Sequence, residues 1–152
     1  MIQRVQSVFL VLAATVMALL FTKPMSFVSI DQAIPPGNAQ SMLADGTFNT
    51  QDHVILLILV ILGIILPVVI IFLYKNRPLQ MKLSRLTIAL IALSIMLTLL
   101  LFYQEYQKIG VGTEVTVQYG YVMLILALLF LVLALRYIRK DEKLVRSADR
   151  LR

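Results

Sequence analysis

The chain has 152 residues, of which 60% are hydrophobic and 14% are charged, and its formal net charge is +6. A soluble domain of this size could not bury so many apolar residues, which occur in long uninterrupted runs of the kind that membrane spans require. The composition therefore excludes an ordinary soluble domain. With no cysteine and one histidine, it also excludes disulfides, thiolate or three-histidine zinc sites and iron–sulfur clusters, so we expect no cofactor and no metal.

The first apolar run covers residues 5–22 and has two interpretations. It could be a signal peptide that is cleaved near Val16-Met17-Ala18, or an uncleaved first transmembrane helix. The run continues past the possible cleavage site to Phe21 and reaches the minimum length of a span, which favours the uncleaved helix.

A polar loop of residues 23–52 follows, and we expect it to cap the outer ends of the helices. Pro35-Pro36-Gly37-Asn38 marks a turn and excludes a continuous helix. Residues 27–30 alternate between apolar and polar side chains as a short strand does, although two strands would be marginally stable alone.

The second span covers residues 54–74 and contains Gly63 and Pro67. Transmembrane helices tolerate proline because neighbouring groups satisfy the freed carbonyl. The two residues therefore indicate a packing kink, with a helix hinge or a local opening for a ligand as the functional alternative.

A basic connector of residues 75–85 leads to the third span, residues 86–103. The polar side chains of this span are Thr87, Ser94 and Thr98, whose hydroxyls we expect to bond to their own helix or to a neighbour.

An outer connector of residues 104–118 precedes the fourth span, residues 119–137. No helix-breaking residue follows, so the tail, residues 138–152, should continue as a helix into the cytoplasm. Its apolar residues Leu144, Ala148 and Leu151 recur at helical spacing among cations. This pattern indicates either a helix that anchors the chain at the membrane surface or a face that docks a partner.

The distribution of Lys and Arg predicts the topology. Twelve of them lie on one side of the predicted membrane, while Lys23 and Lys108 lie on the other, which places both termini in the cytoplasm. The twelve also form a surface suited to anionic lipid headgroups rather than to nucleic acid. They are Arg4, Lys75, Arg77, Lys82, Arg85, Arg136, Arg139, Lys140, Lys143, Arg146, Arg150 and Arg152.

No Asp, Glu, Lys, Arg or His lies in the interior of any predicted span, and this argues against ion-coupled transport. The remaining candidates for chemistry are Asp52 with His53, at the start of the second span, and Glu105 with Glu114, in the outer connector. We interpret the first pair as interfacial groups at a helix start and the second pair as solvated loop residues. No catalytic residue is predicted.

Both ends of the chain resemble a known family. The opening residues 1–6, Met-Ile-Gln-Arg-Val-Gln, lead directly into a span, and the close is the basic segment from Arg139 to Arg152. These motifs resemble the small four-helix membrane proteins of the Bacteroidota catalogued as domain of unknown function 4293. The resemblance implies four spans, cytoplasmic termini and an inner-membrane location, and it transfers no activity and no site residues.

The sequence thus predicts an all-α membrane protein, a bundle of four transmembrane helices in one domain with a cytoplasmic amphipathic helix at its C-terminus. The leading functional hypothesis is a non-enzymatic accessory or scaffold subunit of an inner-membrane complex. The alternatives are a small transporter or lipid-binding protein that uses Pro67 and the hydroxyls of the third span, and an enzyme acting on a lipid through His53, Asp52, Glu105 or Glu114. The lipid bilayer and other inner-membrane proteins are the expected partners.

Overall fold

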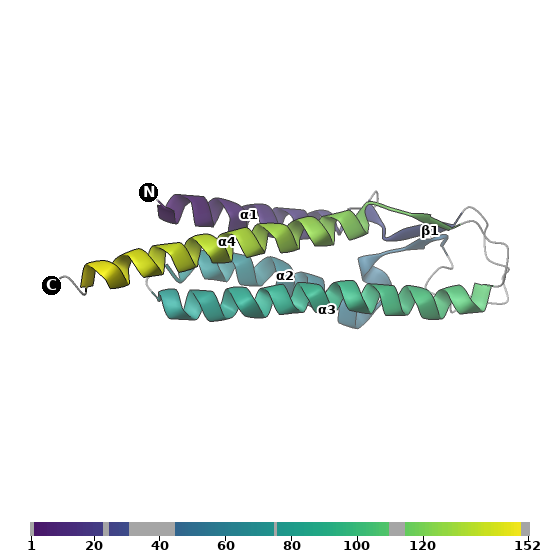
Figure 1. Cartoon of the computed structure of the whole chain (residues 1–152). Helices are drawn as coiled ribbons and strands as arrows, with labels where there is room; N and C mark the ends of the chain where they lie inside the picture. The colour runs from purple at the N-terminus through teal and green to yellow at the C-terminus, as the bar shows by residue number, and fades with distance from the viewer. Residues whose placement is uncertain (1, 23–24, 31–44, 75, 110–114, 150–152) are drawn as a thin grey trace.

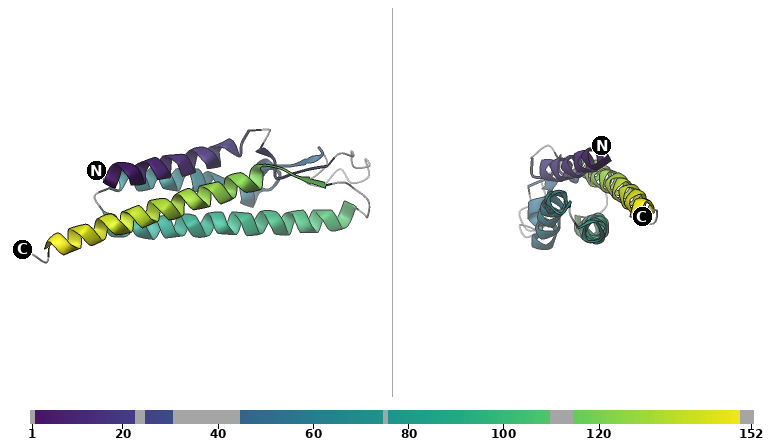
Figure 2. Two further views of the ribbon diagram at one scale, coloured as in Figure 1. Left: turned by 45° about the horizontal axis from the view of Figure 1, so that its top comes forward. Right: turned by 90° about the vertical axis from the view of Figure 1, so that its left-hand side faces the viewer.

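Four helices lie side by side in the computed structural model, which describes residues 2–22, 25–30, 45–74, 76–109 and 115–149 (Figure 1). They are α1 (Ile2–Leu19), α2 (Val54–Phe72), α3 (Arg77–Ile109) and α4 (Gly120–Asp149). Helix α1 contacts α2 and α4, and α3 contacts the same two helices, so the four form a ring when viewed from the end (Figure 2).

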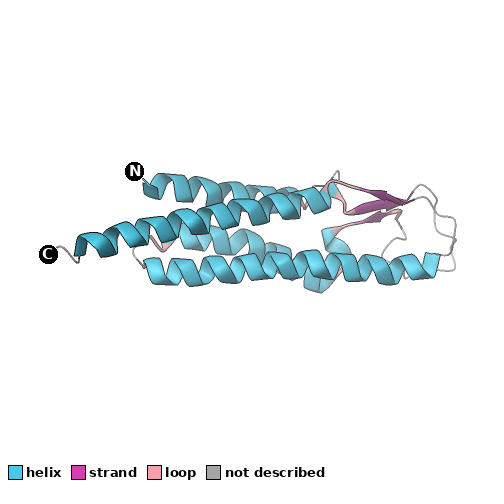
Figure 3. Cartoon of the chain, viewed as in Figure 1, coloured by secondary structure: helices cyan, strands magenta, loops and turns pink. Residues whose placement is uncertain are grey.

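A small antiparallel sheet covers one end of the bundle and departs from the purely α-helical prediction (Figure 3). Its strands are β1 (Val28–Ile30), β2 (Thr47–Phe48) and β3 (Val115–Val117), in the order β2-β1-β3. The alternating pattern at residues 27–30 correctly indicated β1. Strand β3 was not predicted, although Val115-Thr116-Val117 alternates in the same way. It comes from the second outer connector and supplies the third strand that a stable sheet needs.

The bundle places many apolar side chains on its outside and several polar ones in its interior. Large exposed apolar residues occur on every helix, including Val8 on α1, Phe72 on α2, Met96 on α3 and Ile125 on α4. An exposed apolar surface of this extent is unfavourable in water and favourable against lipid chains.

Within the described part of the chain, three helices are long and apolar enough to cross a membrane: α2, residues 77–107 of α3, and residues 120–145 of α4. Helix α1 is apolar but shorter. It ends at Leu19, and the next residues form a turn in which the N–H groups of Leu20, Phe21 and Thr22 donate to carbonyls of the last helical turn. The predicted first span of residues 5–22 is therefore about one turn too long.

Helix α3 extends beyond the predicted third span at both ends. It begins at Arg77, so most of the expected basic connector is helical, and it continues to Ile109 through the first part of the expected outer connector. Pro78 lies in the first turn, where the N–H that proline lacks would have no partner within the helix. No proline or glycine follows it within the helix. At 1.5 Å per residue, its 33 residues make a helix of about 50 Å, longer than the ~30 Å hydrocarbon core of a bilayer.

The two ends of the bundle differ in character. The start of α1, the turn between α2 and α3 and the end of α4 lie at one end, which we call the basic end, and the sheet lies at the other, the sheet end (Figure 1). This arrangement groups Arg77, Lys82 and Arg85 on α3 with Arg139 and Lys143 on α4. The basic end contains the segments that the charge distribution assigns to the cytoplasmic side, and the sheet end contains the segments that it assigns to the opposite side.

Candidate functional site

Four parts of the structure contain the residues that the sequence singles out: the basic end, the buried face of α3, the contact around Gly63, and the polar pocket at the sheet end.

At the basic end, α4 continues past the other helices as one uninterrupted helix to Asp149 (Figure 1). The Arg77 guanidinium at the start of α3 lies 3.3 Å from the Asp141 carboxylate of this extension. Both side chains are partly buried, and the ion pair links the extension to α3. The helical continuation that the sequence predicts is confirmed through Asp149.

The predicted docking face is only partly described. Leu144 is half exposed, and its neighbour Val145, which the sequence analysis overlooked, is 40% exposed. Ala148 lies in the helix without a described side chain, and Leu151 lies outside the described residues. The described part of α4 therefore carries exposed apolar side chains beyond its predicted span.

The basic residues whose side chains the structure describes lie on α3 and α4 at the basic end. Arg77 and Arg85 face the α4 extension, while Lys82 and Lys140 are exposed. Lys75, Arg150 and Arg152 lie outside the described residues, and Arg4 and Arg146 lie in helices without described side chains. The others on α4 are Arg136, Arg139 and Lys143, all exposed.

One face of α3 is buried and largely polar. Its residues alternate at spacings of four and three, which keeps them on the same side of the helix. The hydroxyls in the middle of this row were predicted from the sequence, whereas its length was not, although the regular spacing indicates it. The buried residues of the row are Gln80, Ser84, Thr87, Ile91, Ser94, Thr98, Leu101 and Glu105.

The hydroxyls of this row donate to backbone carbonyls of α3 itself. Ser84 bonds to Gln80, Thr87 to Leu83 and Ser94 to Leu90, at 2.8 to 2.9 Å. Bonding of this kind is the ordinary behaviour of hydroxyls in a transmembrane helix and confirms the expectation for them.

Gln80 connects two helices. Its Nε2 donates to the backbone oxygen of Ile70 at 2.8 Å, and the side chain is almost completely buried. Ile70 lies in the last turn of α2, and its oxygen also accepts from the backbone N–H of Leu73 at 3.2 Å. The Gln80 amide therefore gives this carbonyl a second donor and ties α3 to the C-terminal end of α2.

Replacing Gln80 with leucine should lower the free energy of unfolding by about 1 kcal/mol, because the volume is kept while the Ile70 oxygen loses one of its two donors. Titration with a denaturing detergent would measure this change. Gln104→Leu, on the exposed side of the same helix, is the matched control and should change stability little. Equal losses in the two variants would contradict this role of Gln80.

Glu105 differs from its prediction. It was expected to be a solvated loop residue, but it lies within α3 and is only 5% exposed. It occupies the last position of the polar row because α3 continues beyond the predicted end of the span. Glu114 lies outside the described residues.

Gly63 and Pro67 are both buried, and α2 is one continuous helix through them. A Cβ atom at Gly63 would lie 2.5 Å from the Cε of Met17 on α1 and 3.8 Å from the Cγ1 of Ile91 on α3. The absence of a side chain therefore lets three helices come together. This geometry supports the packing interpretation of Gly63.

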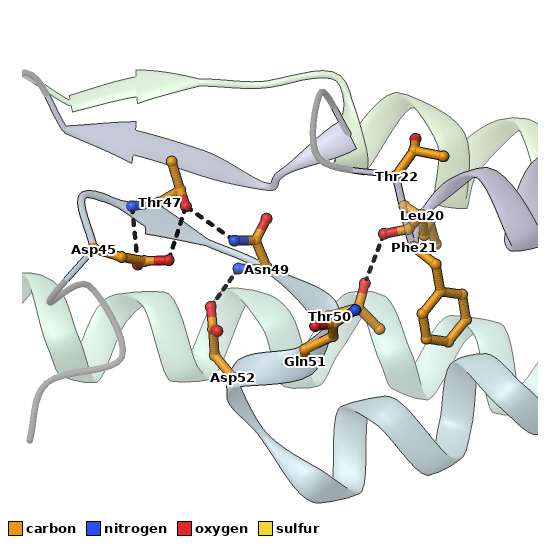
Figure 4. A pocket seen from close by; sticks show the side chains of 9 residues that line it. All are labelled: Leu20, Phe21, Thr22, Asp45, Thr47, Asn49, Thr50, Gln51 and Asp52. Atoms are coloured by element: carbon orange, nitrogen blue, oxygen red, sulfur yellow. Dashed lines mark hydrogen bonds between the residues drawn. The ribbon is translucent and has the colours of Figure 1, made fainter.

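A polar pocket of about 400 Å³ lies at the sheet end, between the end of α1 and the segment that leads into α2 (Figure 4). Its polar lining includes the carboxylates of Asp45 and Asp52. Asp52 accepts a hydrogen bond from the backbone N–H of Asn49. The lining residues are Leu20, Phe21, Thr22, Asp45, Thr47, Asn49, Thr50, Gln51 and Asp52.

Two of the candidate catalytic groups, Asp52 and His53, accept hydrogen bonds from the backbone. The Nδ1 atom of His53 accepts from the backbone N–H of Ile55 at 3.3 Å and so caps α2. The polar pocket is lined by Asp52 but by neither His53 nor Glu105. Within the described residues, no group of three His, Cys, Asp or Glu could hold a metal ion.

Burial raises the pKa of the Asp52 carboxyl above its ordinary value, the Asn49 N–H lowers it, and the Asp45 carboxylate raises it further. The folded protein therefore holds this proton more tightly than the unfolded chain. We therefore expect Asp52 to lower the free energy of unfolding as the pH rises between two values. The lower value is the ordinary carboxyl pKa, and the upper value is the raised pKa of Asp52 in the folded protein. Asp52→Asn should remove this contribution to the pH dependence, which is measured as the free energy of unfolding at a series of pH values. If the free energy of unfolding changes with pH by the same slope in wild type and variant, Asp52 does not cause the change.

Comparison with known proteins gives one match. A family model described as "Domain of unknown function (DUF4293)" matches residues 2–151. No curated protein and no solved structure matches the chain.

Proposed function

Since the chain belongs to the DUF4293 family and has three helices suited to crossing a membrane, we propose that it is a non-enzymatic accessory or scaffold subunit of a bacterial inner-membrane complex. The observation that carries this proposal is the α4 extension, which we define as residues 139–149. It leaves the bundle as a fixed helix with apolar side chains that no other described element covers.

The extension is suited to contact with another protein. The ion pair between Arg77 and Asp141 orders it against α3 before any partner binds, which lowers the entropic cost of association. Leu144 and Val145 are exposed beyond it, next to the cation Lys143. An ordered helix with an apolar patch among charges can bind in a groove of a partner.

We propose that the basic end faces the cytoplasm. The exposed cations of α3 and α4 gather there, together with the ends of α1 and α4, and cytoplasmic segments are enriched in Lys and Arg. The sheet end then faces the periplasm. In this orientation the α4 extension meets cytoplasmic partners or the cytoplasmic parts of membrane proteins.

A pull-down in mild detergent tests the accessory role. An affinity tag inserted in the loop of residues 31–44 leaves both termini free, and the intact chain is compared with a chain truncated after Ile138. We expect a specific partner to be recovered with the intact chain and lost with the truncated one. Leu144→Asn with Val145→Asn should also lose it, while Lys140→Gln should retain it.

Two results would contradict the proposal. One is migration of the intact chain as a lone protomer without a partner under native conditions. The other is recovery of the same partner by the truncated chain, because the extension would then not be the docking element.

The second candidate function is a small transporter or lipid-binding protein. The buried polar row of α3 favours it, because its hydroxyls lie in the interior of a bundle that also contains Gly63 and Pro67 on α2. This function requires a bound lipid or another non-protein molecule between α2 and α3. A high-resolution density map of the purified protein would test that requirement.

A further inference from the structure

A shallow basic cavity, open to its surroundings, lies between the first turns of α3 and the α4 extension. Its volume is about 190 Å³, and Met81, Arg85, Arg139, Glu142 and Lys143 line it. Three cations against one carboxylate leave two net positive charges in the lining. The cavity therefore suits an anionic group.

The two helices that line the cavity are linked to each other, and the cations of its lining are accessible. Arg85, Arg139 and Lys143 are exposed, whereas Met81 and Glu142 are partly buried. The ion pair between Arg77 and Asp141 joins the same two helices within about one helical turn of the cavity, and so holds its two sides at a set separation. The three cations can thus reach an anion without a rearrangement of the helices.

On α4 the lining continues directly into an apolar row. Residues spaced alternately three and four apart share one face of a helix. Counting from Lys143 toward the sheet end, this face changes from cations to apolar side chains, all exposed or partly exposed. Its members are Lys143, Arg139, Arg136, Val132, Leu129, Ile125 and Val122.

On α3 the same spacing gives a second row that begins at Arg85. Its next two members are the exposed alanines Ala89 and Ala92, which leave space beside the helix, and Met96 and Leu99 follow. The cavity therefore lies where each helix changes from cationic to apolar on its outward side. That boundary is the level at which a membrane presents phosphate groups.

We propose that this cavity binds the phosphate of one anionic glycerophospholipid, whose acyl chains follow the apolar rows of α3 and α4. Arginine forms paired hydrogen bonds with phosphate oxygens, and lysine adds a point charge. Basic pockets between transmembrane helices at the cytoplasmic face are suited to anionic headgroups. A free phosphate ion would use the cations but would gain nothing from the apolar rows, so the structure favours the lipid.

The lipid site is independent of the accessory role. It requires that α3 and α4 cross the membrane, and it holds whether or not a protein docks on Leu144 and Val145. A bound lipid would also bridge α3 and the α4 extension, in parallel with the ion pair. The pull-down and the lipid measurement can therefore fail separately.

Native mass spectrometry of the full chain in mild detergent tests the site, with phosphatidylglycerol or phosphatidylcholine as the added lipid. We expect one phosphatidylglycerol to bind in preference to phosphatidylcholine. Arg85→Gln with Arg139→Gln should weaken that binding by about thirtyfold. Lys82→Gln with Lys140→Gln removes the same charge from the same two helices outside the cavity, and it should stay within about threefold of wild type.

Three results would overturn the proposal. Equal weakening by the two double variants would show diffuse attraction to the basic end, and equal binding of the two lipids would show no selectivity for the anionic headgroup. Displacement of phosphatidylglycerol by millimolar inorganic phosphate would identify a free anion as the ligand. If the arginine variant does not fold, Lys143→Gln provides the same test, with an expected weakening of about fivefold.

Discussion

Replacing Gly120 with valine should lower the free energy of unfolding by about 3 kcal/mol or more. A Cβ atom at this position would lie 2.7 Å from the backbone oxygen of Ser26, 2.9 Å from that of Met25 and 2.7 Å from Cδ1 of Phe27. Two of these atoms are backbone oxygens, which cannot turn away as a side chain can. The branched side chain would therefore force the start of α4 away from the segment that leads into β1.

This contact matters because it connects the bundle to the sheet. The N–H of Gly120 donates to the Ser26 oxygen at 2.9 Å, and the N–H of Gln118 donates to the Phe27 oxygen at 2.9 Å. Displacing Gly120 would strain both bonds, and with them the pairing of β1 and β3. We expect the sheet to lose order together with the first turn of α4.

Titration of the purified protein with a denaturing detergent would measure the loss, and hydrogen exchange would locate it. Amides of β1 and β3 should exchange faster in Gly120→Val, while those in the middle of α2 should change little. Val122→Ala, at a half-exposed position two residues later, is the control and should leave both measurements nearly unchanged. A stable Gly120→Val variant with normal protection in β1 would contradict the prediction.

The helices were largely predictable from the sequence because long apolar runs determine them. The α2 helix, the core of α3 and the continuation of α4 past Ile138 all follow from hydrophobic length and from the absence of helix breakers. The ends of α3 were not predictable in this way. Polar residues such as Arg85 and Glu105 marked the ends of an apolar run, but the helix itself continued, because helical hydrogen bonds do not require apolar side chains.

The sheet and the cavities depend on contacts between distant segments. Strand β1 pairs with β3, almost ninety residues later, and the side chains of Ser29 and Thr116 are hydrogen-bonded across that pair at 2.6 Å. The lipid cavity requires Arg85 on α3 to meet Arg139 on α4. Charge counting recognised both arginines as cations of one membrane side, but only the packing of α3 on α4 shows which cations share a cavity.

Replacing Gly63 with leucine should lower the free energy of unfolding by about 2–3 kcal/mol, and shortening Met17 should relieve part of that loss. The clash at Gly63 is with the Cε of Met17, the far end of a flexible side chain, and the next neighbour is 3.8 Å away. Met17 is completely buried, so Met17→Ala alone should cost about 2–5 kcal/mol through the cavity it leaves. In the double variant the leucine should fill that cavity.

A double-mutant cycle would distinguish packing from a hinge. If Gly63 serves close packing, the two changes should compensate by about 1–3 kcal/mol relative to the sum of their separate effects. Ile65→Leu, on the half-exposed side of α2, should instead add to Met17→Ala without coupling. Additive effects of Gly63→Leu and Met17→Ala would exclude the packing role and favour the hinge. If the glycine is needed for helix bending, Gly63→Leu should lower the free energy of unfolding by the same amount whether residue 17 is methionine or alanine.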